Sequence, residues 1–115
     1  MIIPNFPRGC MGISPDEVRG TTLFGLDVRP GSWDLIVAQV IRNSATRQNV
    51  PKSVFVGKLR NDTDCLFVFR QYKCRVGVAD NRPEAMLVEQ MQKRADEYGI
   101  RVWRAYYNAN PGDIA

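Results

Sequence analysis

Residues 74–107 read CRVGVADNRPEAMLVEQMQKRADEYGIRVWRAYY, and this stretch decides the fold. Its opening apolar run is typical of a buried strand, and residues 100–107 predict a second strand. Between them a helix is expected, because Pro83 suits a first helical turn and Gly99 suits the position after a last one. A strand, a helix and a strand in so short a span predict two parallel strands joined by a right-handed crossover.

The expected helix is amphipathic, with Glu84 near the positive end of its dipole. Its apolar face consists of Leu87, Val88, Met91, Ala95 and Tyr98. A second helix is predicted over residues 61–73, where Asn and Asp residues suited to capping precede apolar residues at helical spacing. The run Phe67 to Phe69 would also suit a strand, so this second element has two interpretations.

Three antiparallel strands are expected upstream. The run TTLFGLDV at 21–28 is closed by a Pro-Gly turn, and WDLIVAQVIR at 33–42 is its hairpin partner. SVFVGKL at 53–59 alternates well enough to be the third strand, and the polar residues 43–52 are expected to form a loop. The predicted fold is therefore α/β, with a mixed five-stranded sheet of three antiparallel strands and then two parallel ones, and with helices packed on the sheet.

The chain as a whole predicts one compact domain. It has 115 residues, 44% of them hydrophobic, and a formal net charge of +4, which is compatible with a polyanionic partner without requiring one. Residues 1–20 contain three prolines and little periodicity. They predict an irregular entry segment, so the domain is assigned to residues 21–115.

The cysteines Cys10, Cys65 and Cys74 show no spacing that indicates a disulfide framework or a zinc site, which favours a reducing cytoplasm. No export leader and no apolar run of about 18 residues is found, so no membrane association is expected. The chain contains no histidine and no GxxxxGK[ST] phosphate loop. Histidine-based chemistry and a phosphate-loop ATPase are thereby excluded, and any hydrolysis would need metal-activated water.

The order of elements resembles the ribonuclease H-like fold of metal-dependent nucleases, integrases and resolvases, in which the first and fourth strands lie side by side. Asp27 and Asp80 fall on those two strands, where an uncompensated carboxylate beside apolar neighbours would be costly. Two converging carboxylates would bind Mg²⁺ or Mn²⁺, and two such ions about 3.5–4 Å apart would activate water and stabilise the leaving oxygen of a phosphodiester. The alternatives are a helix cap or turn role for Asp80 and a turn cap before Pro30 for Asp27.

A narrower resemblance rests on four motifs in a fixed order: a helix ending at Tyr72, a strand ending at Asp80, the RPE helix start at 82–84 and the strand VWRAYY at 102–107. Together they resemble the nuclease domain of large terminase subunits from tailed bacteriophages and prophages. The stretch FGLDV is similar to the first-strand motif of that family, whose metal-binding aspartate maps onto Asp27.

This resemblance covers about residues 21–107 and implies catalytic metal ligands at Asp27 and Asp80, with Mg²⁺ or Mn²⁺ in a two-metal site. It implies endonucleolytic cutting of concatemeric double-stranded DNA during genome packaging. The implied partners are the terminase ATPase domain, the small terminase subunit and the portal, in the cytoplasm of a bacterial host. The family's third acidic ligand lies well downstream of the fifth strand, where only Asp113 stands, so the domain is expected to lack its C-terminal part.

Two other functions stay open. One is a non-catalytic DNA-contacting or assembly module of the same fold, derived from a fragment or a prophage remnant. The other is a different ribonuclease H-like enzyme, such as a transposase or a resolvase.

Arginines near predicted strand ends are candidate phosphate ligands, and Arg29 and Arg82 are favoured because they adjoin the two aspartates. Arg75, Arg101 and Arg104 are further candidates. A solvated basic surface is the alternative interpretation for each of them.

Asp34 lies just past the first turn and would reach the site from the neighbouring strand, whereas Asp62 and Asp64 suit helix capping. Four aromatic residues could stack on bases, although their positions in strands favour packing. These are Trp33, Trp103, Tyr106 and Tyr107.

Overall fold

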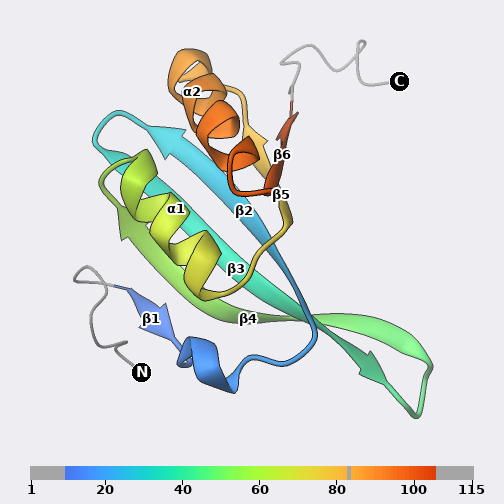
Figure 1. Cartoon of the computed structure of the whole chain (residues 1–115). Helices are drawn as coiled ribbons and strands as arrows, with labels where there is room; N and C mark the ends of the chain where they lie inside the picture. The colour runs from blue at the N-terminus through green and yellow to red at the C-terminus, as the bar shows by residue number, and fades with distance from the viewer. Residues whose placement is uncertain (1–9, 83, 106–115) are drawn as a thin grey trace.

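A computed structural model describes residues 10–82 and 84–105 of the chain as one six-stranded sheet with two α-helices (Figure 1). The elements in chain order are β1 (Met11–Gly12), the 3₁₀ helix η1 (Pro15–Glu17), β2 (Thr21–Arg29), β3 (Ser32–Asn43), β4 (Gln48–Leu59), α1 (Asp62–Gln71), β5 (Val76–Asp80), α2 (Ala85–Asp96) and β6 (Arg101–Ala105).

The sheet has the strand order β1-β4-β3-β2-β5-β6. Strands β2, β3 and β4 form an antiparallel meander, while β5 pairs in parallel with both β2 and β6. The expected α/β class, the mixed sheet and the adjacency of the first and fourth predicted strands are confirmed. The strand count is corrected from five to six.

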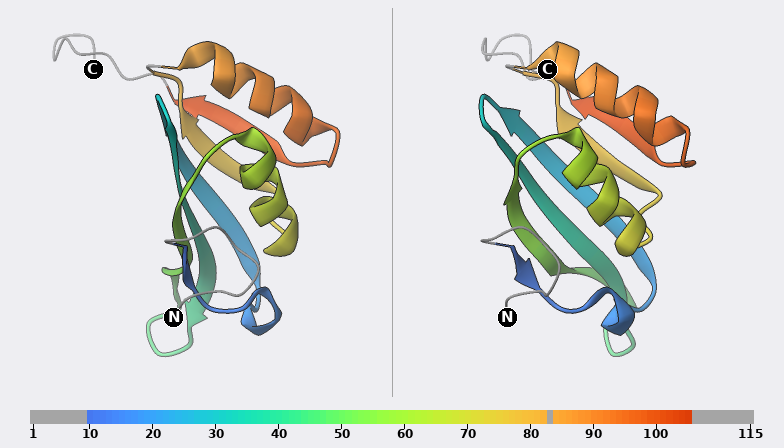
Figure 2. Two further views of the ribbon diagram at one scale, coloured as in Figure 1. Left: turned by 90° about the vertical axis from the view of Figure 1, so that its left-hand side faces the viewer. Right: turned by 60° about the vertical axis from the view of Figure 1, so that its left-hand side comes forward.

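Both helices pack on the same face of the sheet, as the side view in Figure 2 shows. Strand β2 alternates accordingly: Phe24, Leu26 and Val28 are buried towards the helices, and the residues between them lie on the other side. Among the described residues no helix covers that other side, which we call the helix-free face.

The core between helices and sheet contains a close aromatic stack. The rings of Phe24 and Phe69 lie 3.9 Å apart between centroids with their planes 18° apart. Gly77 on β5 makes room for it, because a Cβ at that position would lie 2.3 Å from atoms of the Phe24 ring. The α1–sheet contact therefore depends on a residue without a side chain.

Both helices end in the same hydrogen-bonded motif. After α1, the Cys74 N–H donates to the Phe69 carbonyl at 2.8 Å and the Lys73 N–H to the Arg70 carbonyl at 3.2 Å. After α2, Ile100 and Gly99 repeat this pattern, and Gly99 has φ +73°, which confirms it as the C-terminal stop. Lys73 holds the equivalent left-handed position with φ +55°.

The N-terminal region contributes more to the sheet than its irregular sequence suggests. Residues 11–12 form β1, which pairs antiparallel with β4 and supplies the sixth strand. Cys10 is fully buried, and the Tyr72 hydroxyl donates to the Ile13 carbonyl at 2.6 Å. A two-residue strand has no periodicity to read, so its pairing is set by these tertiary contacts. Residues 1–9 lie outside the described part of the chain.

The loop expected at 43–52 is corrected, because β4 already begins at Gln48. The β3–β4 ladder continues to the pair Asn43 and Gln48, beyond Val40, which is the last residue of β3 that pairs with β2 in this direction. Residues 48–52 are exposed and include Pro51, so they lack the alternation that marks a half-buried strand.

Helix α1 is confirmed over the strand alternative. Its N-cap is Asn61, whose side chain accepts from the Asp64 N–H at 2.9 Å. The Asp64 carboxylate accepts from the Arg60 backbone N–H at 3.4 Å, so it does help to cap the helix start, whereas the capping role expected of Asp62 is corrected. Asp62 instead pairs with Arg94 at 2.7 Å and links α1 to α2.

Helix α2 begins at Ala85, and Pro83 lies outside the described residues. Its buried face is narrower than expected: Val88, Met91 and Ala95 are buried, whereas Leu87 and Tyr98 are exposed. No helix in the described residues is long and apolar enough to cross a membrane. The three cysteines are free and buried.

A candidate acidic site on the helix-free face

Three aspartates stand in one row across the helix-free face. On the β2–β3 hairpin, Asp27 is directly opposite Asp34, and Asp34 is opposite Lys58 of β4. Strand β5 continues the row on the other side, since Leu26 pairs with Ala79 and the next residues along the two strands are Asp27 and Asp80. We call Lys58, Asp34, Asp27 and Asp80 the acidic row.

The row is positioned by the tight turn between β2 and β3. Pro30 and Gly31 form a two-residue connection, in which Gly31 has φ +77°, so Arg29 pairs with Ser32. Side chains on a strand alternate between faces, so residues two positions earlier and later share the face of Arg29 and Ser32. This register places Asp27 and Asp34 on one face and next to each other.

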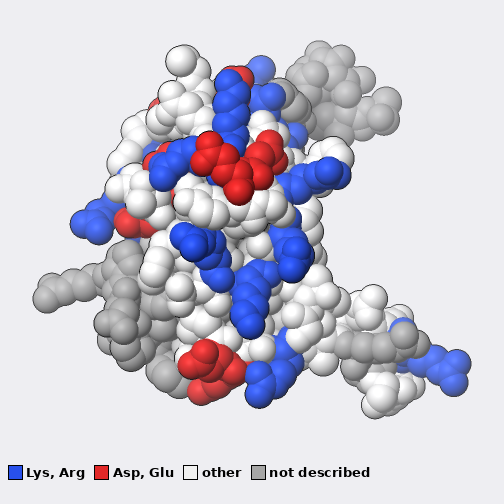
Figure 3. All heavy atoms as spheres, viewed as in Figure 1, with Lys and Arg blue, Asp and Glu red and all other residues white. Residues whose placement is uncertain are grey.

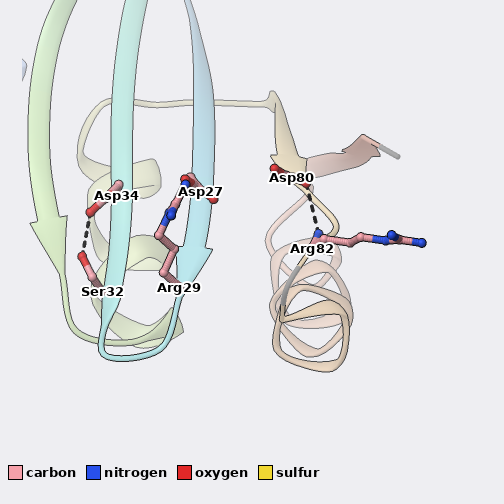
Figure 4. A network of polar contacts seen from close by, with 6 residues as sticks. All are labelled: Asp27, Arg29, Ser32, Asp34, Asp80 and Arg82. Atoms are coloured by element: carbon pink, nitrogen blue, oxygen red, sulfur yellow. Dashed lines mark hydrogen bonds and ion pairs between the residues drawn. The ribbon is translucent and has the colours of Figure 1, made fainter. Parts of the chain in front are cut away.

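Each aspartate has one close polar neighbour. Asp27 forms an ion pair with the Arg29 Nε at 2.9 Å, and Asp34 accepts a hydrogen bond from the Ser32 hydroxyl at 2.7 Å. Asp80 Oδ1 accepts from the Arg82 backbone N–H at 3.1 Å (Figure 4). Asp80 therefore does fill the expected turn role, but it does not cap α2, whose N-cap residue is Glu84.

The Arg29 guanidinium contacts Asp27 and lies within the electrostatic influence of Asp34 and Asp80. Its pKa is raised above the usual value chiefly by the hydrogen bond and the charge of Asp27; desolvation opposes this, and the charges of Asp34 and Asp80 add smaller contributions. The Arg29 side chain is 66% exposed and the Asp27 side chain 36% exposed. This ion pair is thus open to solvent, and a stronger cation or a phosphate can compete with either partner.

The acidic row lies in an open groove of about 1030 Å³ that crosses β4, β3, β2, β5 and the end of β6. Its carboxylates stand at one end, beside apolar side chains such as Ile36, Val56 and Val78. Gly25 lies at its centre on β2, where an added Cβ would meet nothing within 4 Å. The missing side chain leaves the backbone beside Asp27 open to close approach by a ligand.

The sequence-predicted residues divide into those in the groove and those away from it. Asp27, Asp34 and Asp80 line it, and Arg29 is bonded to Asp27. The Arg82 side chain points away from the aspartates in Figure 4, and only its backbone contacts Asp80. Tyr106, Tyr107 and Asp113 lie outside the described residues.

The remaining candidates have other surroundings. Trp33 is buried in the core, as its strand position predicts. Trp103 is 58% exposed, and the Arg101 guanidinium lies 5.8 Å from its ring centroid. Arg104 donates to the Asn81 side chain at 3.5 Å, and Arg75 lines a separate hollow between the C-terminal ends of α1 and α2.

Lys58 is the groove residue that the sequence reasoning missed. Its signal was available in the alternation of SVFVGKL, which places it on the same face as Val56. That pattern does not give the register of β4 against β3, and this register places Lys58 opposite Asp34.

The donor chemistry of the row suits a hard divalent cation, because carboxylate oxygens are the ligands that Mg²⁺ and Mn²⁺ prefer. The arrangement is not a closed metal cage: within residues 10–82 and 84–105, no three His, Cys, Asp or Glu side chains are grouped closely enough to hold an ion. The row thus offers carboxylate ligands from adjacent strands, and Arg29 forms an ion pair with one of them, Asp27.

No protein-family model matches the chain, and no curated protein matches it. Among solved structures, RuvC from Thermus thermophilus superposes with a TM-score of 0.59 at 12% sequence identity. The match covers 75% of this chain and 64% of the RuvC chain, so the chain spans less than two thirds of that protein. At this identity the likeness shows the fold alone, and that fold is ribonuclease H-like.

Proposed function

We propose that this chain is a metal-dependent DNA endonuclease domain, or a large part of one, with Asp27 and Asp80 as catalytic metal ligands. The observation that carries the proposal is the parallel pairing of β2 with β5, which brings these two carboxylates to the same end and the same face of adjacent strands. The ribonuclease H-like fold supports the same class of function.

The reaction would use the acidic row as follows. Asp27 and Asp80 would hold Mg²⁺ or Mn²⁺, with Asp34 supplying oxygen from the neighbouring strand. The bound metal supplies an activated water and stabilisation of the leaving oxygen. Arg29 would leave Asp27 and hold a non-bridging phosphate oxygen, while the open backbone at Gly25 admits the sugar–phosphate strand.

The finer assignment to the nuclease domain of a phage or prophage large terminase subunit is part of this proposal. It rests on the order of the motifs around Tyr72, Asp80 and residues 102–107. Cutting of concatemeric DNA, and partnership with an ATPase domain, a small terminase subunit and a portal, would follow from it.

Plasmid nicking tests the proposal. We expect the purified chain to nick supercoiled DNA in Mn²⁺ or Mg²⁺, and Asp27→Asn and Asp80→Asn each to reduce the rate by at least about 100-fold. Asp64→Asn makes the same charge change in the first turn of α1, outside the groove, and should keep full activity. Retention of activity by both groove variants would contradict the proposal.

Metal binding gives a second readout. Arg29→Gln removes the cation that competes for Asp27, so we expect it to raise the Mn²⁺ affinity measured by calorimetry while lowering the nicking rate. A structural role for Arg29 alone would not raise metal affinity. Unchanged Mn²⁺ affinity would show that the guanidinium does not occupy the metal's place.

A second candidate function is a non-catalytic DNA-contacting module of the same fold. The open arrangement of the acidic row, without three grouped ligands in the described residues, favours it. In that case the chain would bind duplex DNA but neither nick it nor bind Mn²⁺ through Asp27 and Asp80.

A further inference from the structure

The hairpin between β3 and β4 extends beyond the sheet as a two-stranded ribbon. Strand β2 has its last partner on β3 at Val40, and β1 pairs with β4 at Phe55 and Val56. Residues 41–50 therefore pair only with each other among the described residues, and they project from the sheet in Figure 1. We call this segment together with Pro51 and Lys52 the arm.

The arm carries only positive charge. Its charged residues are Arg42, Arg47 and Lys52, and no Asp or Glu occurs anywhere between Leu35 and Asn61. Arg47 and Lys52 are exposed, and blue spheres mark the tip of the arm in Figure 3. The molecule as a whole contains 12 acidic residues, so this long acid-free stretch makes the arm a local basic surface.

The arm also holds features that are unfavourable for a free ribbon. Ile41 and Val50 stand opposite each other and are 43% and 45% exposed. Arg47 has φ +57°, a left-handed conformation that favours glycine or asparagine over arginine. A two-stranded ribbon with solvent on both sides is only marginally stable by itself. These features fit a segment that is completed by a partner.

We propose that the arm binds duplex nucleic acid by entering its major groove. A two-stranded ribbon fits that groove, which is about 12 Å wide. Arg47 and Lys52 would contact phosphates on its walls. By register, Ile41 and Val50 lie on the face of the ribbon that points away from the acidic row. Charge selects nucleic acid over an apolar protein partner, because all the ionised groups on the arm have the sign that phosphates require.

The distance from the arm to the acidic row is less than one turn of a duplex, so a single duplex can span both, a step that rests on the proposed function. Asp34 and Ile41 are seven residues apart on β3, and Asp34 and Asn43 are nine apart. At about 3.4 Å per residue these separations are about 24 and 31 Å. The helical repeat of B-DNA is about 34–36 Å. A duplex with one backbone at the acidic row would thus reach the arm within one helical turn.

The path between the two sites is compatible with a duplex. On the helix-free face β3 presents Ile36, Ala38 and Val40 between Asp34 and the arm, and none of these is acidic. Lys58 stands beside Asp34 on β4, at the near end of this path. The two contacts would act together to fix the direction and the register of the duplex.

Equilibrium binding to a duplex of about 30 base pairs tests the arm. The measurement is made in EDTA, so that cleavage plays no part, over a series of salt concentrations. We expect Arg47→Gln with Lys52→Gln to lower the slope of log K against log salt by about 2 and to weaken binding by at least about tenfold at physiological salt. The matched control, Arg70→Gln with Lys93→Gln, makes the same charge change on the helices and should leave the slope within about 0.5 of the unmodified value.

Two outcomes would overturn the inference. One is an equal effect of both double variants, since only total charge would then matter. The other is no measurable duplex binding by the unmodified chain, which would show that the arm does not bind duplex DNA. Loss of nicking in Asp27→Asn with normal arm-dependent binding would support the arm and the nuclease separately. Binding that depends on the arm without any nicking would support the arm while refuting the proposed function.

Discussion

Tyr72 contacts three parts of the fold, and its replacement by phenylalanine should lower the free energy of unfolding by a predictable amount. The side chain is 2% exposed, and its ring packs against Phe55 with 5.6 Å between centroids. Its hydroxyl donates to the Ile13 carbonyl at 2.6 Å, and its own carbonyl accepts from the Thr22 hydroxyl at 2.9 Å. The end of α1, the start of the chain and β2 therefore meet at this residue.

Tyr72→Phe removes one hydrogen bond and keeps the packing. The lost bond is worth about 1 kcal/mol net, and the carbonyl of Ile13 loses this donor, which adds up to about 1 kcal/mol. We expect a loss of about 1–2 kcal/mol at neutral pH, or about 4–8 °C in Tm for a domain of this size. Tyr98→Phe is the matched control, because the Tyr98 ring is half exposed and its contact with Arg70 is kept.

The pH dependence gives an independent check. Burial, and then the nearby Cys10 and Cys74 thiols, raise the pKa of Tyr72 to about 12. In the unfolded chain the phenol titrates near about 10, so neutral Tyr72 stabilises the fold fully below that pH and loses its contribution as pH rises through the folded value. The native chain should lose about 1.4 kcal/mol more than Tyr72→Phe by pH 11, and up to about 2.7 kcal/mol well above pH 12.

Urea denaturation followed by circular dichroism at about pH 7 and about pH 11 would measure both effects. The difference between the native chain and Tyr72→Phe should shrink by about 1.4 kcal/mol at the higher pH, to near zero. Equal stability of the two proteins at neutral pH, or a constant difference across the range, would refute the reasoning about the buried hydroxyl.

Two further pairs of substitutions test packing and backbone conformation by the same denaturation assay. Gly77→Ala places a Cβ 2.3 Å from the Phe24 ring, which is already stacked, so a loss of about 1–3 kcal/mol is expected; Gly25→Ala, whose Cβ meets nothing within 4 Å, is its near-neutral control. Lys73→Gly relieves a left-handed backbone at φ +55° and should gain about 0.5–1 kcal/mol, whereas Gly99→Ala at φ +73° should lose a similar amount. The packing argument fails if the two alanine variants of the sheet are equally stable, and the backbone argument fails if Lys73→Gly gives no gain.

The parts of the fold that sequence predicts well are those fixed by local signals. The unit from β5 to β6 contains an apolar strand, an amphipathic helix and a glycine stop, and each can be recognised without knowledge of the rest. Gly99 shows why: its left-handed conformation is a property of a few neighbouring residues. The parallel order of the two strands then follows from the length of the connection.

The missed features depend on contacts with distant residues. The pairing of β1 with β4 and the burial of Cys10 come from tertiary packing. A two-residue strand is too short to show a sequence pattern from which they could be predicted. The first part of β4 is exposed on both sides, so it carries no hydrophobic period. Its residues were therefore interpreted as a loop, although they form half of the arm.

The candidate site could be predicted from the sequence in part. Asp27 and Asp34 could be matched from the sequence, because a two-residue turn at Pro30 and Gly31 fixes the register of both strands. The orientation of Arg82 could not, since a side chain beyond a strand end is free to point in several directions. The position of Lys58 needed the register of a third strand.

The charges of the acidic row support a functional interpretation over a purely structural one. Like charges directly opposite on an antiparallel pair destabilise a sheet, yet Asp27 and Asp34 face each other on a central hairpin. Arg29 and Lys58 offset this repulsion only in part, because two cations stand among three carboxylates. A sheet selected for stability alone would be better served by neutral residues here. The strands instead hold carboxylates in one row in an open groove, and under the proposed function a divalent cation would turn their repulsion into binding.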